Sequence, residues 1–382
     1  MKVAFVIGTL QRGGSERQIV EFVRAAHPDH AECVVICQGQ EGPLASEVRA
    51  TGAKVIAIDL EGSRSLRGIG QFAHGLGRLA KALRAEQPDV VYAFLFWGYS
   101  IGVPLAALVV PRACRVQGRR SLPEVDVPGR SIFLGLRRIT NRYTHGAIAN
   151  SLAVGGAVAR HEPALAGRLW VVPNGVRGVG RRSRPDGSLT IVCVANLKPN
   201  KGHATLLGAV SRLRSDGWSL LLVGEGPERS NIEQMIASAN LRERVMMLGG
   251  RVDVHDILNT ADIVVLPSYS EGMPNAVLEA MAHGVPVVAS DVGGVRSLLG
   301  SGAGIVVPPR DVSALTNALQ RLIDEPSLRS NMGEKGHELT NGSLSVDAML
   351  KATLSAISQI CERRAGRTGR SNRAALSWKR RT

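Results

Sequence analysis

The sequence predicts an α/β protein with two doubly wound, Rossmann-like domains that face each other across a cleft, and three observations support this. Short apolar runs alternate with segments of helical period along most of the 382 residues. That alternation is typical of a parallel sheet covered by helices on both faces. It also restarts after a stretch rich in Gly, Arg and Ser near residue 180, and the chain is long enough for two ordinary domains.

The expected strands are short apolar runs that end in glycine or polar residues. In the first domain they are 3–8, 33–37, 54–60, 89–94, 114–118, 146–150 and 169–174, and in the second 189–197, 219–224, 244–250, 262–268, 285–290 and 304–309. Between these strands, apolar residues recur with the period of a helix over 15–26 and 69–85, which predicts helices there. We therefore predict domains over 1–180 and 181–345, a helix over 346–364 that packs back on the first domain, and a basic, disordered tail over 365–382.

Charge and cysteine content restrict the partners and the compartment. Lys and Arg outnumber Asp and Glu by 47 to 32, which predicts an anionic partner. No nucleic-acid-binding motif accompanies the basic segments, so nucleic acid is not expected, and phosphorylated substrates or an anionic membrane surface remain. Five cysteines without a CxxC pair indicate reduced thiols in a cytoplasmic protein. No apolar run reaches the ~20 residues of a transmembrane helix.

Segment 130–143 predicts a helix with one apolar side and several arginines. The apolar side consists of Ile132, Phe133, Leu136, Ile139 and Tyr143, and the arginines, Arg130, Arg137, Arg138 and Arg142, lie elsewhere. Two interpretations stay open. Either this helix and the basic tail bind anionic lipid at the inner face of the cell membrane, or the apolar side packs in the core of the first domain.

A glycine-rich loop follows the first expected strand. Gly13 and Gly14 precede a helix, and glycines at such a place let backbone amides approach a phosphate closely. A tight structural turn explains the same residues equally well. Gly14 stands where a Walker A loop has lysine, so a P-loop hydrolase is not expected.

Two strand ends of the second domain carry residues suited to a phosphate. Lys201 follows a strand and opens a helix, so its ammonium can reach the crevice beside that strand. Gly224 lies in a glycine-rich turn after the next strand. A surface lysine at a helix start is the alternative, but parallel strands end at one edge of a sheet, where ligands of such folds bind.

A carboxylate lies in an apolar helix that begins near Asn275. Glu279 is flanked by Leu278 and Ala280, and a buried carboxylate costs several kcal/mol unless it accepts hydrogen bonds. The two hydroxyls of a ribose are suitable donors, and the free amides at the start of the helix point toward the crevice. An internal salt bridge is the alternative partner for Glu279.

The spacing of Glu271 and Glu279, with seven residues between them in "PSYSEGMPNAVLEAMAHGVPVVASDVGG", resembles the E-x7-E signature of family-4 glycosyltransferases. These are retaining enzymes of the GT-B fold. Further stretches are similar to the family: the Gly-Gly loop, "RSLPE", "IANS", "VVPNGV", "NLKPNKGH", "LLLVGEGPE" and "GIVVPPRD". The resemblance implies that the first domain binds an acceptor and the second a nucleotide sugar.

The resemblance also implies roles for individual residues. Glu279 would bind the ribose of the donor, and Glu271 the hydroxyls of the transferred sugar. Lys201, with the backbone at Gly272 and Met273, would hold the diphosphate. The other implied donor contacts are Gly13 and Gly14 over the same phosphates, Arg251 and Val252 at the base, and Gly224, Asn275 and Asn196 along the crevice.

Two departures from the family concern cations and the acceptor side. Asn196 stands where many members have an arginine, so Lys201 must neutralise more of the phosphate charge. A histidine that many members carry after residues 114–118 is absent, and Arg119 or Arg120 is the substitute expected near the leaving phosphate. We therefore predict Glu271, Lys201 and Arg119 as catalytic residues, and no metal or other cofactor, since no metal-ligand spacing occurs among the histidines.

The function predicted from sequence is a retaining hexosyl- or N-acetylhexosaminyl-transferase. It would use a nucleotide-diphosphate sugar and act on a lipid-linked or cell-envelope glycan acceptor, in polysaccharide biosynthesis. Two alternatives remain: a nucleotide-sugar epimerase of the same architecture, and a non-catalytic module that binds an anionic polymer.

Overall fold

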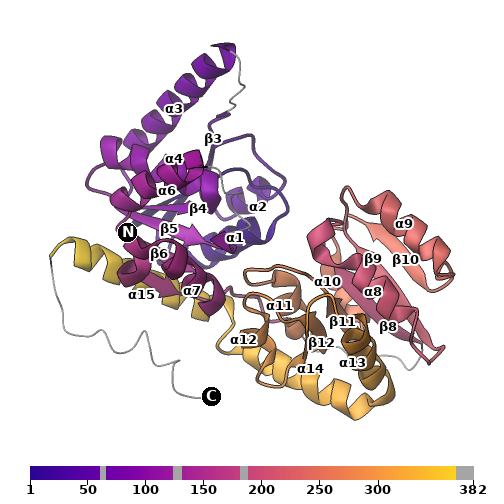
Figure 1. Cartoon of the computed structure of the whole chain (residues 1–382). Helices are drawn as coiled ribbons and strands as arrows, with labels where there is room; N and C mark the ends of the chain where they lie inside the picture. Colours follow the sequence, from indigo (N-terminus) through magenta and orange to yellow (C-terminus); the bar gives the residue numbers. More distant parts are fainter. Residues whose placement is uncertain (61–65, 124–130, 181–187, 367–382) are drawn as a thin grey trace. The chain divides into compact units, whose positions relative to one another are not determined.

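The computed structural model describes residues 1–60, 66–123, 131–180 and 188–366, which form two compact units (Figure 1). The first unit comprises Met1–Asn174 and the chain from Val346 onward, and the second comprises Gly175–Ser345. The division falls at 174/175 rather than at the expected 180/181. The reason is that Val176 packs in a core of the second unit, and its amide donates a hydrogen bond to Leu344 O at 3.0 Å.

The described part of the first unit has a seven-stranded parallel sheet in the order β3-β2-β1-β4-β5-β6-β7. The strands are β1 (Lys2–Ile7), β2 (Glu32–Cys37), β3 (Lys54–Ala57), β4 (Val90–Phe94), β5 (Cys114–Arg119), β6 (Gly146–Ala149) and β7 (Leu169–Val171). The helices are α1 (Gly14–Ala26), α2 (Ala45–Arg49), α3 (Leu66–Glu86), α4 (Leu95–Val109), α6 (Ser131–Tyr143), α7 (Leu152–His161), η1 (Pro163–Arg168) and α15 (Val346–Arg364).

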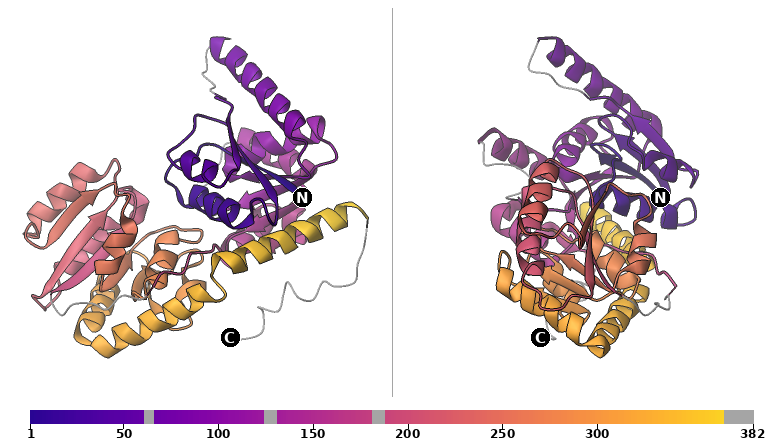
Figure 2. Two further views of the ribbon diagram at one scale, coloured as in Figure 1. Left: turned by 180° about the vertical axis from the view of Figure 1, so that it is seen from behind. Right: turned by 90° about the vertical axis from the view of Figure 1, so that its right-hand side faces the viewer.

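Helices cover both faces of this sheet. Side chains of β1 point alternately to the two faces, so Val3 and Phe5 lie in one core while Ala4 and Val6 lie in the other. The first core is closed by α1 and α15, and the second by α3 and α4. Helix α15, yellow in Figure 2, lies beside α1 and β5. It is also tied to β7, because Trp170 Nε1 donates to Gln359 Oε1 at 3.0 Å.

The described part of the second unit has a six-stranded parallel sheet in the order β10-β9-β8-β11-β12-β13. The strands are β8 (Leu189–Val194), β9 (Trp218–Val223), β10 (Val245–Gly249), β11 (Ile263–Leu266), β12 (Val287–Ser290) and β13 (Gly304–Val307). The helices are η2 (Pro199–Lys201), α8 (His203–Val210), α9 (Arg229–Ser238), α10 (Val254–Thr260), α11 (Asn275–Ala282), α12 (Val295–Leu299), α13 (Val312–Asp324) and α14 (Pro326–Asn341). Each expected strand overlaps an observed one, and the predicted pair of doubly wound α/β domains is confirmed.

Helix α6 does not have the simple two-sided character expected from its sequence. Phe133 and Leu136 pack against the core beside α4, whereas Ile139 and Tyr143 are exposed. Arg137, expected on the charged side, is buried, because its guanidinium lies over the ring of Phe96 and donates to a backbone carbonyl. The apolar side is therefore divided between core and surface. Arg130, the side chain of Ile132 and the tail over 367–382 lie outside the described residues.

Candidate functional site at the carboxyl edge of the second sheet

In the second sheet the strand order reverses direction at β8: strands added on one side of β8 come before β11 in the chain, and those on the other side begin with β11. Strand β8 lies between β9 and β11, so the connection from β8 to β9 leads one way and the connections through β11 and β12 lead the other. Open parallel sheets bind ligands beside the carboxyl ends of the two strands at such a point. Lys201 follows β8 and Glu271 follows β11, so both lie at this point.

Two glycines with left-handed backbone hold the loops of this edge together. Gly202 has φ +72° and its Cα approaches the carbonyl of Pro267, which ties the loop after β8 to the end of β11. Gly293 has φ +55° and packs against the carbonyl of Glu271. A Cβ at either position would collide with these carbonyl oxygens and would also strain the backbone. Sequence analysis missed Gly293, although a Gly-Gly pair two residues after the end of an expected strand is a signal for such a close approach.

The ion pair between Lys201 and Glu271 is the central polar contact of this edge. Lys201 Nζ lies 2.6 Å from Glu271 Oε1, and the two side chains are 21% and 12% exposed. Backbone contacts fix both loops, since Tyr269 N donates to Asn200 O at 2.8 Å. The structure thus brings together two of the predicted site residues that are far apart in sequence.

Helix α11 begins at Asn275, as expected, and its first turn lies next to Glu271 in the chain. Gly272 and Met273 are buried, while Glu279 is only half-buried and not enclosed as its apolar neighbours suggested. The helix buries one side, which includes Val277 and Leu278, and Glu279 lies outside that side.

The remaining predicted residues of the second unit lie on neighbouring loops. Gly224 has φ +151° and approaches the carbonyl of Ala195, while Asn196 beside it is exposed. Arg251 and Val252 follow β10 and are exposed, and Arg251 Nη2 pairs with Asp253 Oδ2 at 2.6 Å. The loop ends of β8, β9, β10 and β11 therefore carry the predicted contacts along one edge.

The glycine loop of the first unit follows β1, which lies between β2 and β4 at the corresponding point of its own sheet. Gly13 is the N-cap of α1, and the carboxylate of Glu16 lies against it. Burial raises the pKa of Glu16. The predicted phosphate loop of this unit thus already has a carboxylate beside it.

Arg119 does not occupy a position suited to the role that the sequence suggested. Its side chain is 1% exposed and forms an ion pair with Glu162, which also accepts a hydrogen bond from Asn141 Nδ2 at 2.7 Å. The guanidinium also donates to the hydroxyl of Tyr99. The catalytic role of Arg119 stays a prediction, and the structure does not favour it, because β5 directs this side chain into a buried polar network. The alternative, Arg120, is half-buried and donates to Asn174 Oδ1 at 2.8 Å.

A buried histidine next to Lys201 escaped sequence analysis. His203 is 4% exposed, and neither ring nitrogen has a hydrogen-bond partner within the described part of the chain. Burial, together with the nearby charge of Lys201, lowers the pKa of His203 to about 4. Burial likewise lowers the pKa of His145 and of His283 to about 4, with contributions from Arg115 and His255 respectively.

These histidines predict a loss of stability in mild acid. They are neutral in the folded protein, while in the unfolded chain their pKa returns to about 6.5, so below that pH only the unfolded state takes up these protons. We expect His203 alone to lower the free energy of unfolding by about 2 kcal/mol between pH 7 and pH 5. Melting temperatures of wild type and His203→Leu over this range measure the effect. Equal pH dependence of the two proteins would contradict it.

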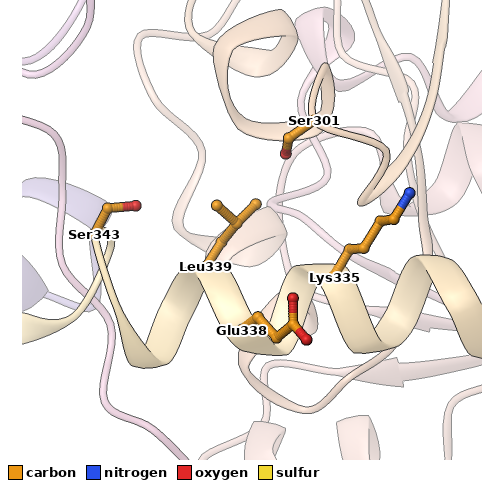
Figure 3. A pocket seen from close by; sticks show the side chains of 5 residues that line it. All are labelled: Ser301, Lys335, Glu338, Leu339 and Ser343. Carbon is orange, nitrogen blue, oxygen red and sulfur yellow. The ribbon is translucent and has the colours of Figure 1, made fainter.

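The cavity in Figure 3 lies away from the carboxyl edge. It measures about 370 Å³ and is bounded by α14 and the loop before β13, with Ser301, Lys335, Glu338, Leu339 and Ser343 as its lining. None of these is a predicted site residue. In the chain outside the undescribed ranges, no group of three or more His, Cys, Asp or Glu side chains is placed to hold a metal ion. Nor does any described helix combine the length and apolarity needed to cross a bilayer.

Comparison with known proteins gives curated relatives and a solved structure that resemble this chain. Alpha-D-kanosaminyltransferase from Streptomyces kanamyceticus is 32% identical over 41% of this chain and 42% of its own length. Lipopolysaccharide core biosynthesis glycosyltransferase LpsE from Rhizobium meliloti is 30% identical over 44% of this chain and 50% of its own. The chain thus spans half or less of these curated relatives. The crystal structure of Anabaena HepE in complex with UDP-glucose superimposes with a TM-score of 0.81 at 20% identity, over 94% of this chain and 100% of that one, and so shares the GT-B fold.

Two family models match consecutive parts of the chain. The model described as Glycosyltransferase Family 4 matches residues 12–177, and the model described as Glycosyl transferases group 1 matches residues 180–339. The first match covers the first unit from residue 12 to the end of its amino-terminal segment, without β1, and the second match lies within the second unit. The chain therefore belongs to the glycosyltransferase family that these two models describe.

Proposed function

We propose that this protein transfers a sugar from a nucleotide-diphosphate sugar to a lipid-linked or cell-envelope glycan acceptor, with retention of the anomeric configuration. The transferred group is a hexose or an N-acetylhexosamine, and the reaction serves polysaccharide biosynthesis on the cytoplasmic side of the membrane. Relatives named for lipopolysaccharide core and teichuronic acid biosynthesis support this choice of acceptor. The HepE structures with UDP and UDP-glucose support the choice of donor.

One observation carries the proposal: Lys201 and Glu271 lie 2.6 Å apart at the point where the second sheet changes winding direction, directly before helix α11. A donor needs a cation for its diphosphate and hydrogen-bond acceptors for its hydroxyls, and this edge offers both. We assign Lys201 to the diphosphate, Glu271 to hydroxyls of the transferred sugar and Glu279 to the ribose.

The proposed mechanism relies on charge stabilisation. The bond between sugar and diphosphate breaks through an oxocarbenium-like state, and negative charge accumulates on the leaving phosphate. Lys201 and the positive end of the helix dipole at the amino terminus of α11 stabilise that charge. Same-face attack retains the configuration, and the leaving phosphate accepts the proton of the attacking hydroxyl. We propose no metal for this step.

Turnover with and without an acceptor tests the function. A thermal-shift screen of UDP, GDP, ADP and dTDP identifies the base, because a bound nucleotide at about 100 times its Kd stabilises the fold by about 2.7 kcal/mol. Matching nucleotide sugars are then incubated with the protein, alone and with an extract of lipid-linked glycans. Consumption only with the extract supports a transferase. Conversion without it indicates an epimerase, and binding without turnover indicates a binding module.

Replacing Glu279 with glutamine is expected to weaken donor binding while the fold stays intact. The amide keeps the shape but loses the charge, so affinity falls by about 1.5 to 3 kcal/mol, the value of a hydrogen bond to a charged group. Calorimetric titration and a melting curve on the same protein measure both effects. Glu233→Gln, which changes an exposed carboxylate on α9 paired with Arg229, is the matched control. A large drop in melting temperature with unchanged affinity would instead indicate the internal salt bridge.

Exposed side chains of the first unit support a peripheral membrane contact. Trp97 of α4 and Leu134 and Ile139 of α6 are exposed, and Arg138 and Arg142 on α6 are exposed with them. Apolar and basic side chains on one helix are typical of binding to an anionic lipid surface. We expect salt-sensitive flotation with anionic vesicles, and less of it for Arg138→Glu/Arg142→Glu. Equal flotation with neutral and anionic vesicles at low salt would refute this contact.

A further inference from the structure

Lys201 and Glu271, the two side chains to which we assign the diphosphate and the sugar of the donor, form an ion pair with each other. Under the proposed function, the ammonium faces the diphosphate and the carboxylate faces sugar hydroxyls. In the structure each group satisfies the other instead, at 2.6 Å. A ligand that binds the ammonium of Lys201 must therefore also supply hydrogen-bond donors to the carboxylate of Glu271, which has lost its partner.

The backbone around the pair keeps the two side chains together. Lys201 ends a short 3-10 turn, and its amide donates to Lys198 O at 3.0 Å. On the other side, Gly294 N donates to Gly272 O at 2.8 Å, and Gly293 packs on the carbonyl of Glu271. With both loops fixed, only rotation of the two side chains can separate the carboxylate from the ammonium when a ligand reaches Lys201. The pair thus couples the diphosphate position to the sugar position.

We propose that this ion pair makes the site discriminate between a nucleotide sugar and the nucleoside diphosphate that remains after transfer. A nucleotide sugar brings hydroxyls that donate to Glu271, so the carboxylate keeps hydrogen-bond partners when Lys201 turns to the phosphates. At this ion pair a nucleoside diphosphate brings only negative charge, because its ribose hydroxyls are assigned to Glu279. If its phosphates take Lys201, Glu271 is left as an unpaired carboxylate beside them. If Lys201 stays paired with Glu271, the phosphates bind to an ammonium whose charge is already partly neutralised.

The proposal rests on the proposed function and predicts an opposite effect of one substitution on two ligands. Glu271→Gln removes the negative charge, frees Lys201 and abolishes the repulsion, so binding of the nucleoside diphosphate tightens by about fivefold, as expected for one partly exposed ion pair. The same change weakens binding of the nucleotide sugar, because the amide is a poorer acceptor for sugar hydroxyls. Product inhibition of transfer should strengthen in parallel.

Calorimetric titration of the full chain tests this with the nucleoside diphosphate that gives the largest thermal shift among UDP, GDP, ADP and dTDP, and with its glucose, N-acetylglucosamine, galactose and mannose derivatives. The matched control is Asp216→Asn. Asp216 also forms an ion pair, with Arg244 at 2.5 Å, but it is 92% exposed and precedes β9, at the opposite edge of the sheet. We expect both affinities of the control to equal those of wild type. Glu271→Ser serves as a second variant if Glu271→Gln melts early.

The possible outcomes separate this inference from the function itself. Tighter diphosphate and weaker nucleotide-sugar binding in the Glu271 variants supports the inference. Unchanged or weaker diphosphate binding in a folded variant overturns it, even when the wild type transfers sugar. If the wild type binds none of the nucleotide sugars, the proposed function fails, and the inference fails with it.

Discussion

Replacing Lys201 with alanine lowers the rate of sugar transfer by about 100- to 1,000-fold, the loss typical of removing one preorganised donor to a developing charge. Donor affinity falls less, because the charge on the leaving phosphate is greatest as the bond breaks. Single-turnover rates and donor titrations on the same protein measure the two effects.

The matched control for this change is Lys198→Ala, which removes an exposed lysine three residues earlier in the same loop. We expect it to leave turnover near that of wild type. If Lys201→Ala weakens donor binding as much as it slows turnover, Lys201 contributes only to ground-state binding, and the proposed role in the reaction is refuted.

Replacing Arg119 with methionine is expected to cost about 3 to 5 kcal/mol of folding free energy, since it leaves Glu162 as a buried charge without its partner. Adding Glu162→Gln should restore part of the loss, because the uncompensated charge disappears. Urea unfolding of the single and double variants measures this, with Arg138→Met as the control for an exposed arginine of the same unit.

Activity per folded molecule should remain close to that of wild type in Arg119→Met. A stable variant with strongly reduced turnover would restore the catalytic role that the sequence suggested for Arg119. The structure argues against this result, since Arg119 is buried and its guanidinium donates to Tyr99 and Glu162.

Periodicity in the sequence was sufficient to predict the fold. Strands of a doubly wound sheet are buried on both faces, so they appear as continuous apolar runs such as 263–266, and loops with glycine mark their ends. The edge of the second sheet was predictable for the same reason: Lys201 and Glu271 each follow such a run. Their direct contact was not predictable, because it depends on β8 and β11 being neighbours.

Side-chain direction was the part that the sequence could not determine. Arg119 is the last residue of a strand, and a shift of one residue would turn it to the other face. Glu279 has apolar neighbours along the chain, but its burial depends on which side of α11 packs against the core. The packed side includes Val277 and Leu278, and Glu279 is half-buried. Gly293 is needed because of a carbonyl more than 20 residues away, and the Gly-Gly pair in the sequence does not reveal which residue that carbonyl belongs to.

The return of α15 to the first unit makes the second unit an inserted domain. The chain enters it at Gly175 and leaves it at Ser345, and a parallel bridge joins Val176 to Ser345, so entry and exit are adjacent. We therefore expect residues 175–345 to fold when they are produced alone or permuted, because their natural ends lie close together. A stop codon after Ser345, by contrast, would damage the amino-terminal half, because it strips Met349, Ile357 and Ile360 from the core built around β1.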